Sequence, residues 1–330
     1  MKLATLKDGS RDGQLAVVSR DLATAHYATS HARTLQQLLD DWNFISPQLE
    51  DLYATLNGGK ARHAFPFDPR QCMAPLPRAC QWLDGSAYLS HVERVRRARG
   101  AEIPPWLRDE PLLYQGGSDD LQGATDDACF ASADWGIDFE AEIAVITGDV
   151  AIGAGSEAAL DAVRLLTLAN DWSLRELIPA ELARGFGFVQ GKPATAFGPL
   201  AVTPDELGAA WQRGRARLTL VCQRNGTELG RLDTAEGMHF HFGQLIAHAA
   251  RTRRLGAGSI AGGGTVSVAD ALQAAQGVAC LAEIRAIESA AAGAPTTGWL
   301  QFGETVRLEA FDAEGNSVFG AIEQRVAAIG

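Results

Sequence analysis

Apolar runs along the chain predict mainly short β-strands joined by turns. Strand patterns occupy residues 15–18, 137–146, 216–224, 303–311 and 317–326. The third run ends in Asn225-Gly226, a dipeptide that favours the positive φ angles of a type I′ hairpin. The last two runs flank a turn at 314–316, so we expect them to pair with each other.

Helical periodicity is limited to shorter parts of the chain. Apolar residues recur at helical spacing in segments 35–45, 159–168 and 238–254. The last segment ends in arginines, which interact favourably with the C-terminal end of a helix dipole. These patterns predict an α+β fold dominated by β-structure.

A proline-rich stretch divides the chain into two unequal parts. Prolines recur between residues 66 and 77, and each one disfavours helical geometry in the residue before it. We interpret this stretch as an extended linker. The sequence therefore predicts a small N-terminal domain, residues 1–78, followed by a main domain, residues 79–330.

The composition is that of an ordinary globular chain and excludes several classes of protein. Of 330 residues, 46% are apolar and 21% are charged, which excludes a disordered or fibrous protein. The formal net charge of −11 is spread along the chain and argues against a nucleic-acid-binding surface. No apolar run has the length of a signal peptide core or a membrane span, so we expect a cytoplasmic protein without membrane contact. The 5 cysteines include no C-x-x-C pair, so we expect reduced thiols rather than disulfides or a zinc ribbon.

Two glutamates interrupt the apolar pattern of segment 137–146. Glu140 and Glu142 share one face of a strand, and that face continues as Ala144 and Ile146. The opposite face is apolar too, so both carboxylates are expected beside a core, where unpaired charges are costly. A hard divalent cation would compensate them: Mg²⁺ or Ca²⁺, with Mn²⁺ as a further candidate. The alternative is an exposed edge strand on which the glutamates pair with arginines.

A third acid and a lysine extend this candidate site. Asp171 follows an apolar run and could be a helix cap. However, Ser173 and Glu176 have the spacing of a capping box for the following helix, which leaves Asp171 available as a metal ligand. Lys192 is held between a glycine and a proline. It is either a solvated loop residue or, beside the carboxylates, a fixed cation for a developing oxyanion.

The histidines differ in what their positions indicate. A lone histidine such as His91 is more often structural than catalytic, but beside metal ligands a neutral imidazole is suited to deprotonating water near pH 7. His239 and His241 stand two residues apart at the start of a predicted helix. Side chains at that spacing do not face each other, so we expect packing or capping roles for them.

Together these motifs resemble the fumarylacetoacetate hydrolase family. They follow the family's order with compatible spacings: Asp84-x6-His91, Asp138-Phe-Glu140-Ala-Glu142, Asn170-Asp171-Trp172-Ser173, Gln190-Gly191-Lys192 with Phe197-Gly198-Pro199, and Gly263-Gly264-Thr265-Val266-Ser267. The resemblance covers most of residues 80–326, and residues 1–78 loosely resemble the small SH3-like domain of longer members. It implies a mixed β-sandwich roll, a homodimer and one divalent metal held by carboxylates.

The resemblance also implies a role for each matching residue. The implied metal ligands are Glu140, Glu142 and Asp171, with Asp84 as the fourth, as in the fumarylacetoacetase branch. His91 would activate water, Lys192 would polarise the substrate carbonyl, and Glu283 would orient the histidine. Tyr114 and Thr265 correspond to substrate-contacting positions. The arginine expected shortly after the tyrosine is absent.

The implied reaction is hydrolysis of a carbon–carbon bond in a 1,3-diketo acid. The expected substrate is fumarylacetoacetate, cleaved to fumarate and acetoacetate in aromatic amino-acid catabolism. Acylpyruvate (fumarylpyruvate) hydrolase and oxaloacetate decarboxylase are alternatives within the family, and that branch carries a Tyr-x-x-His-x-x-Glu motif. Here Tyr88 and His91 are followed by Arg94, and the glutamate falls one place early at Glu93.

Two further classes of function fit the sequence less well. A non-catalytic binding protein on the same scaffold would not need a base such as His91 together with an oxyanion donor such as Lys192. Glycines at 256–264 could suggest a dinucleotide-dependent redox enzyme, but they lack the G-x-G-x-x-G spacing and a surrounding βαβ unit. Turns between strands are therefore the favoured interpretation of these glycines.

Overall fold

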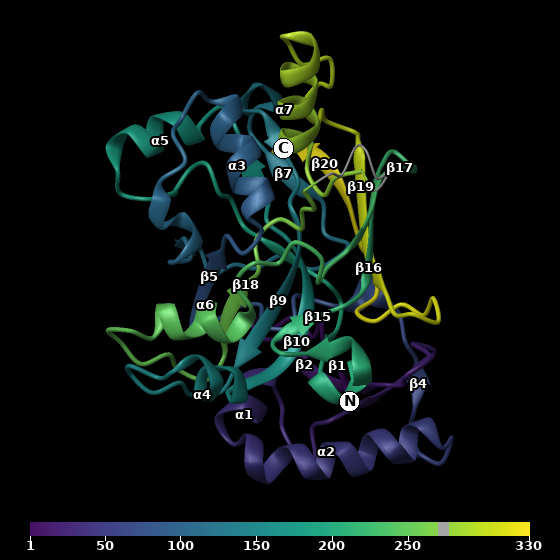
Figure 1. Ribbon diagram of the computed structural model, residues 1–330. Helices are drawn as coiled ribbons and strands as arrows, with labels where there is room; N and C mark the ends of the chain where they lie inside the picture. Colours follow the sequence, from purple (N-terminus) through teal and green to yellow (C-terminus); the bar gives the residue numbers. More distant parts are fainter. Residues whose placement is uncertain (270–276) are drawn as a thin grey trace.

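A computed structural model of the chain describes residues 1–269 and 277–330. Within these residues, an 11-stranded sheet and a five-stranded sheet form the body of the molecule, with helices around them (Figure 1). The large sheet runs in the order β4 (Phe65–Pro66), β3 (Thr24–Tyr27), β2 (Gln14–Val18), β1 (Lys2–Leu6), β13 (Ala201–Val202), β10 (Val163–Asn170), β9 (Ala141–Thr147), β18 (Ser259–Gly262), β5 (Gln81–Gly85) and β6 (Leu113–Gly116), and β12 (Ala196–Phe197) pairs with β10.

The remaining strands and the helices surround this sheet. The five-stranded sheet has the order β17 (Thr227–Asp233), β16 (Thr219–Arg224), β19 (Thr305–Phe311), β20 (Ile322–Ala328) and β7 (Ala128–Phe130). Two short pairs are β8 (Ile137–Asp138) with β11 (Ser173–Leu174), and β14 (Trp211–Gln212) with β15 (Arg215–Ala216). The α-helices are α1 (Leu35–Asp40), α2 (Trp42–Asn57), α3 (Leu89–Ala98), α4 (Ser156–Asp161), α5 (Ile178–Arg184), α6 (Phe242–Ala249) and α7 (Leu281–Ala292). Short 3-10 helices are η1 (Pro69–Gln71), η2 (Pro105–Arg108), η3 (Ala133–Trp135) and η4 (Pro204–Ala210).

Strand β9 separates two hydrophobic cores. Ile143 and Val145 face the core that also contains side chains of β16 and β19. Ala144 and Ile146 face the second core, in which α1 and α2 cover the other side of the large sheet. Both faces of the strand are buried, as its sequence predicted. The β-dominated α+β fold is therefore confirmed.

The N-terminal segment continues the large sheet. Strand β1 pairs antiparallel with β13, where Lys2 stands opposite Val202. Strands β2, β3 and β4 extend the sheet outward from β1, and α2 lies beneath β1 and β2 (Figure 1). The division into domains at residue 78, and the SH3-like character of the first, stay predictions.

The predicted hairpins occur in the second sheet. Strands β16 and β17 are joined by Asn225 and Gly226, whose φ angles are 51° and 75°, so both central residues of the turn have positive φ. Strands β19 and β20 pair antiparallel, as predicted for the two terminal runs. All five cysteines are unpaired thiols. No helix in the described ranges is both long and apolar enough to cross a membrane.

The helix predicted at 159–168 is wrong beyond its first turn. Helix α4 ends at Asp161, and β10 begins at Val163. Leu165 faces one core and Leu166 the other, so the segment is buried on both sides between β9 and β13. Periodicity does not separate a doubly buried strand from a buried helix, and pairing with both neighbours decides for the strand here.

Two other predictions about helices need correction. The helix predicted at 238–254 is shorter, because α6 begins after His241, which caps it in a capping box with Gln244. Ser173 and Glu176 form no capping box: Ser173 lies in β11, and α5 starts later, at Ile178. The Ser173 hydroxyl donates to the Asp171 carbonyl instead.

Candidate active site

Four buried carboxylates converge at one end of the large sheet. The residues are Asp84, Glu140, Glu142 and Asp171, each of which offers an oxygen within 4.8 Å of the others. Glu142 stands at the start of β9, and Asp171 directly follows the paired end of β10, so antiparallel pairing brings them together. The Asp171 N–H donates to the Glu140 carbonyl at 3.0 Å, which joins the third acid to this pair. All four side chains are at most 7% exposed.

A glycine between two strands lets the fourth acid approach. In β18, Gly262 pairs with Asp84 of β5 on one side and with Ala144 of β9 on the other. A Cβ atom at Gly262 would lie 2.6 Å from Asp84 Oδ1 and 2.9 Å from Glu142 Oε2. Both distances are shorter than real contacts allow. The absence of a side chain at Gly262 therefore permits the two carboxylates to meet across β18.

One acid of the cluster is neutralised by cations. Glu140 accepts from the Lys192 ammonium at 2.6 Å through Oε2 and from the Arg175 guanidinium at 2.6 Å through Oε1. Burial disfavours this carboxylate, but the charges of Lys192 and Arg175 outweigh burial and hold its pKa well below the usual range. The alternative of an arginine pair was thus half right: the pair forms, but in the interior rather than at an exposed edge.

On the other side of the cluster, Asp84 and Glu142 form no ion pair with a lysine or arginine of the described residues. Burial raises the pKa of Asp84, and repulsion from Asp171 raises it further. Burial and then repulsion from Asp84 act in the same way on the pKa of Glu142. In the described part of the chain, Asp84 Oδ1 and Glu142 Oε1 are buried without a hydrogen-bond partner. Orphaned carboxylate oxygens in an all-oxygen donor set fit a hard divalent cation, which supplies the missing charge.

An acid outside the cluster, Glu181, fixes the loop that carries Lys192. Glu181 of α5 accepts from the backbone N–H groups of Val189, Gln190 and Gly191 at 2.9, 2.8 and 2.8 Å. Burial opposes the ionised form, but these hydrogen bonds outweigh it and lower the pKa of Glu181. The next residue, Lys192, is thereby aimed at the cluster.

The Lys192 ammonium lies between two acids. Its Nζ atom donates to Glu140 and to Asp171 Oδ2, each at 2.6 Å. Burial disfavours the ammonium, but the charges of Asp171 and Glu140 raise its pKa above the ordinary value. The Tyr114 hydroxyl also donates to Asp171 Oδ2, at 2.5 Å, and Thr195 donates to Oδ1 at 2.7 Å. Lys192 is therefore a permanent cation at this site.

His91 stands opposite the cluster and is hydrogen-bonded to an acid outside it. Its Nδ1 atom lies 3.2 Å from Glu283 Oε1, and its Nε2 atom lies 3.8 Å from Glu140 Oε1. Ser267 donates to Glu283 at 2.7 Å. Burial opposes ionisation of Glu283, but its hydrogen bonds to His91 and Ser267 lower its pKa. An ionised carboxylate only accepts, so Nδ1 carries the hydrogen and Nε2 is free to accept a proton.

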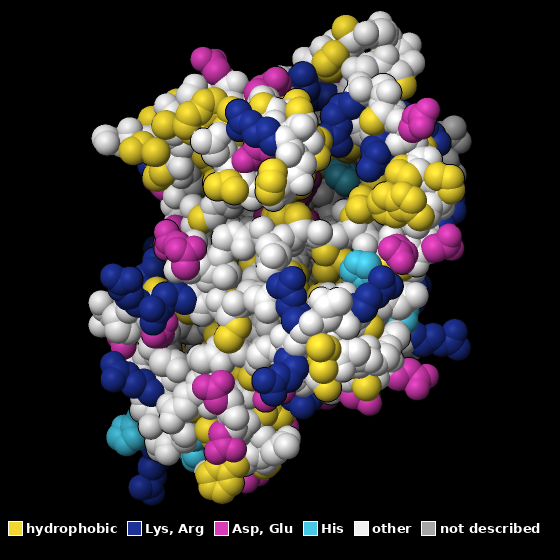
Figure 2. Space-filling model, turned by 90° about the vertical axis from the view of Figure 1, so that its left-hand side faces the viewer, with side chains coloured by type: hydrophobic (Ala, Val, Ile, Leu, Met, Phe, Trp, Pro, Cys, Tyr) yellow, Lys and Arg dark blue, Asp and Glu magenta, His cyan; other side chains and the backbone are white. Residues whose placement is uncertain are grey.

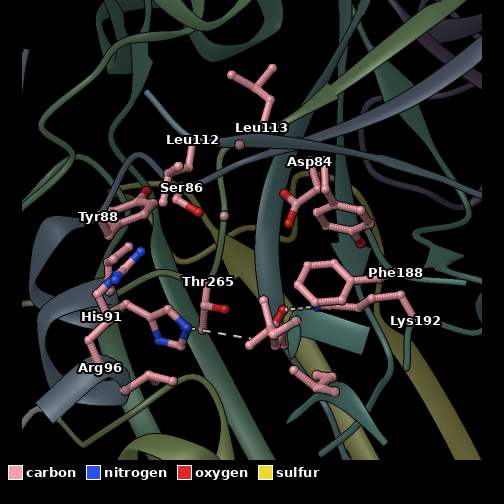
Figure 3. A pocket seen from close by; sticks show the side chains of 18 of the residues that line it. Asp84, Ser86, Tyr88, His91, Arg96, Leu112, Leu113, Phe188, Lys192 and Thr265 are labelled. Atoms are coloured by element: carbon pink, nitrogen blue, oxygen red, sulfur yellow. Dashed lines mark hydrogen bonds and ion pairs between the residues drawn. The ribbon is translucent and has the colours of Figure 1, made fainter. Parts of the chain in front are cut away.

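These groups surround a cavity of about 570 Å³. The predicted site residues that line it are Asp84, His91, Tyr114, Glu140, Lys192 and Thr265. Figure 3 shows His91 on one side of the space and Lys192 with Phe188 on the other. In the view of Figure 2, the face that carries α3 and α5 is hollowed, with basic and hydrophobic side chains beside the hollow. Glu142, Asp171 and Glu283 lie behind this lining and contact it.

Sequence reasoning missed two residues that support the site. Arg175 bridges Glu140 and Asp138, with its Nε atom 2.8 Å from Asp138 Oδ2. Asp138 in turn accepts from the N–H groups of Leu281 and Ala282 at 2.7 and 3.0 Å, and so caps α7, the helix that carries Glu283. Asp138 belongs to the acidic strand segment singled out in the sequence. Its partners lie 37 and about 140 residues away, so local spacing gave no signal for them.

The departure from the Tyr-x-x-His-x-x-Glu motif has a structural counterpart. Glu93 points to Arg108 and Arg97, at 2.8 and 3.2 Å, rather than to the histidine. Arg94 donates to Ser267 at 3.0 Å and lies 3.4 Å from Glu283. In this chain the acid beside His91 is thus supplied by α7 rather than by the histidine's own helix.

Several solved structures have the same fold as this chain. A probable 2-hydroxyhepta-2,4-diene-1,7-dioate isomerase from Mycobacterium abscessus has a TM-score of 0.67 at 18% identity, with 100% of both chains covered. Maleylpyruvate hydrolase from Sphingobium sp. SYK-6, solved with manganese(II) and pyruvate, has a TM-score of 0.65 at 16% identity, again with 100% of both chains covered. Fumarylpyruvate hydrolase from Pseudomonas aeruginosa, solved with Mn²⁺ and pyruvate, has a TM-score of 0.54 at 16% identity over 82% of this chain and 93% of its own. At these identities the likeness shows a shared fold.

The family assignment rests on matches between the sequence and models of protein families. A search of curated protein sequences finds no match. The model described as fumarylacetoacetase N-terminal domain 2 matches residues 1–78. The model described as fumarylacetoacetate (FAA) hydrolase C-terminal matches residues 80–327, which include every residue of the site. The chain belongs to the fumarylacetoacetate hydrolase family.

Proposed function

We propose that this protein hydrolyses a carbon–carbon bond in a 1,3-diketo acid, with fumarylacetoacetate as its substrate. One observation carries the proposal. A histidine backed by an ionised carboxylate, a buried ammonium and a carboxylate cluster with orphaned oxygens all meet at one cavity. A site that only binds a ligand needs no base and oxyanion donor together.

The carboxylate cluster would hold one divalent cation. The ligands would be Asp84, Glu140, Glu142 and Asp171, and Mg²⁺, Ca²⁺ and Mn²⁺ are all suited to oxygen donors. Two fold relatives were solved in complex with both Mn²⁺ and pyruvate, which supports a site for a divalent ion and a 2-oxo acid. When bound, the cation would polarise the substrate's carbonyl oxygens and lower the energy of the enolate that leaves.

His91 would act as the base. Its Nε2 atom faces the cavity and would take a proton from water, while Glu283 stabilises the imidazolium that results. The hydroxide oxygen then bonds to the substrate's carbonyl carbon, and the π electrons move to the carbonyl oxygen. Charge therefore develops on that oxygen as the tetrahedral intermediate forms.

Lys192 would stabilise this oxyanion. Its ammonium is fixed by two acids and by the Glu181-bound loop, so little reorganisation is needed as charge develops. Collapse re-forms the carbonyl and breaks the carbon–carbon bond, whose electron pair passes to the neighbouring carbon as an enolate. The proton held on His91 returns to that carbon, so base and acid are one residue and the protons balance.

A second candidate is cleavage of an acylpyruvate such as fumarylpyruvate, or decarboxylation of oxaloacetate. The observation in its favour is the fold likeness to maleylpyruvate and fumarylpyruvate hydrolases. The placement of Glu93 away from His91, with Asp84 in the cluster, favours the longer diketone. Hydrolysis of an acylpyruvate would use the same base and cation, whereas decarboxylation of oxaloacetate would use the cation without deprotonating water.

A panel of substrates tests the proposal. Purified protein with Mg²⁺ is assayed on fumarylacetoacetate, fumarylpyruvate and oxaloacetate, and the assays are repeated after EDTA treatment. We expect the fastest cleavage of fumarylacetoacetate and its loss on chelation. The variants His91→Ala and Lys192→Met should each lose roughly 10²-fold or more in kcat, whereas the matched control His239→Ala, whose ring binds the Arg108 carbonyl, should not. Unchanged turnover in either site variant, or in metal-free protein, would contradict the mechanism.

A further inference from the structure

The cations of the cavity wall fall into two groups. Lys192 and Arg175 are already paired with acids of the site. Arg96 and Arg99 also line the cavity, but within the described residues neither has a carboxylate within 4.0 Å. Their guanidinium groups contact only backbone carbonyls, those of Glu102 at 3.0 Å and Val95 at 3.2 Å. Two cations of the wall are therefore available to an anion.

Arg96 lies on the helix that carries the base, and Arg99 directly follows that helix as its C-terminal cap. They follow His91 by five and eight positions, which places them about 7.5 and 12 Å further along the axis of α3. Figure 3 shows His91 and Arg96 on the same side of the cavity. Both side chains therefore start from backbone positions beyond His91.

Much of the remaining cavity wall is apolar. Its side chains include Val92 and Val95 of α3, Leu112 and Leu113 before and in β6, and Phe188. Such a wall suits the carbon chain of a ligand and offers no partner for a charge along it. The cavity therefore combines the carboxylate cluster and apolar side chains with Arg96 and Arg99, which we call its basic end.

The basic end carries uncompensated positive charge. Arg99 is an exposed residue, but partial burial of its guanidinium lowers its pKa, and repulsion from Arg175 and Arg96 lowers it further. Attraction to Glu140 opposes these effects without cancelling them. An anion placed between Arg96 and Arg99 would relieve the repulsion and could be held through forked N–H donors.

We propose that Arg96 and Arg99 form a subsite for a carboxylate at the far end of the substrate's acyl chain. The subsite restricts the enzyme to 2-oxo or diketo acids with a second, distal carboxylate. This inference rests on the proposed function for the orientation of the substrate, with its keto end at the carboxylate cluster. The basic end of the cavity requires the anion independently of which bond is cleaved.

Binding of two non-cleavable probes tests the subsite. 2-Oxoadipate and 2-oxohexanoate share a keto-acid head and a chain length, but the first ends in a carboxylate and the second in a methyl group. Calorimetry with Mn²⁺-loaded protein should show 2-oxoadipate binding roughly 10- to 100-fold more tightly. The double variant Arg96→Gln/Arg99→Gln should lose this preference and keep its affinity for 2-oxohexanoate. Arg97→Gln is the matched control, because Arg97 lies on the same helix but pairs with Glu93 outside the cavity.

The outcomes separate the subsite from the reaction. Equal binding of the two probes by wild type, no binding of 2-oxoadipate, or a preference that survives in the double variant overturns the subsite. A preference that depends on both arginines, in a protein that cleaves no diketo acid, supports the subsite and rejects the proposed function. A protein that cleaves diketo acids but shows no preference between the two probes supports the proposed function and rejects the subsite.

Discussion

His91 Nδ1 lies 3.2 Å from the Oε1 atom of Glu283, a carboxylate that is fully buried. This contact sets which ring nitrogen faces the cavity and stabilises the imidazolium that proton transfer creates. Glu283→Gln keeps the shape and one acceptor but removes the charge. We expect kcat to fall roughly 10- to 100-fold while KM and Mn²⁺ affinity stay near the wild-type values.

Steady-state kinetics on the best substrate, with calorimetry of Mn²⁺ binding, checks this prediction. Circular dichroism controls for folding. A variant that retains kcat within twofold would show that Glu283 does not act through His91. A parallel loss of Mn²⁺ affinity would place its effect on the cation site instead.

The second prediction concerns the glycine between Asp84 and Glu142. Gly262→Ala adds a Cβ at 2.5 Å from the Trp82 ring, 2.6 Å from Asp84 Oδ1 and 2.9 Å from Glu142 Oε2, so the two carboxylates must shift together with the ring. We expect divalent cation affinity to fall roughly 10- to 100-fold, by analogy with the loss of groups that orient metal ligands. Gly298→Ala is the control, since its Cβ would meet nothing within 4 Å. Equal Mn²⁺ affinity in the Gly262→Ala and Gly298→Ala variants would contradict the prediction.

The third prediction concerns pH and the loop that positions Lys192. The ionised Glu181 side chain accepts three backbone hydrogen bonds, and its pKa is lowered from the ordinary value of 4.5. A lowered pKa in the folded protein contributes stability that is present above pH 4.5 and is lost as pH falls toward the folded-state pKa. Glu181→Gln should therefore reduce the free energy of unfolding by about 1 to 3 kcal/mol at pH 7, and by less as pH drops below 4.5.

Urea unfolding of both proteins across this pH range provides the measurement. The same variant should lower kcat, because Gly191 and Lys192 lose their anchor. Glu157→Gln, at an exposed position of α4, is the control. A stability difference that grows toward acidic pH would have the wrong sign and would exclude this role for Glu181.

Alternation along segment 137–146 predicted a common face for the first two acids, but Glu140 lies in the break between β8 and β9 rather than within a strand. Glu140 and Glu142 were predicted to share a face beside a core, and the structure brings both into one buried cluster. The same local rule failed for segment 163–168, because apolar residues that are buried on both sides look alike in a helix and a strand. The conformation is decided by pairing with β9 and β13, and the periodicity of the sequence carries no information about that pairing.

The contacts that complete the site are non-local. Lys192 and Glu140 are 52 residues apart, and His91 and Glu283 are 192 apart, so only resemblance to a family suggested that they meet. Asp171 was considered available because Ser173 and Glu176 seemed to cap a helix. That reason was wrong, since Ser173 lies in a strand. Asp171 nevertheless joins the cluster, because the end of β10 delivers it next to β9.

Cation binding by the carboxylate cluster is tested directly by titrating metal-free protein with Mn²⁺. The titration is monitored by calorimetry and electron paramagnetic resonance. We expect one Mn²⁺ per chain, bound in competition with Mg²⁺. We also expect at least roughly 100-fold weaker binding in Glu142→Gln and Asp171→Asn, while His91→Ala binds the ion normally. A protein that binds no divalent ion, or binds it equally well without these carboxylates, would contradict the central claim that the cluster holds the cation.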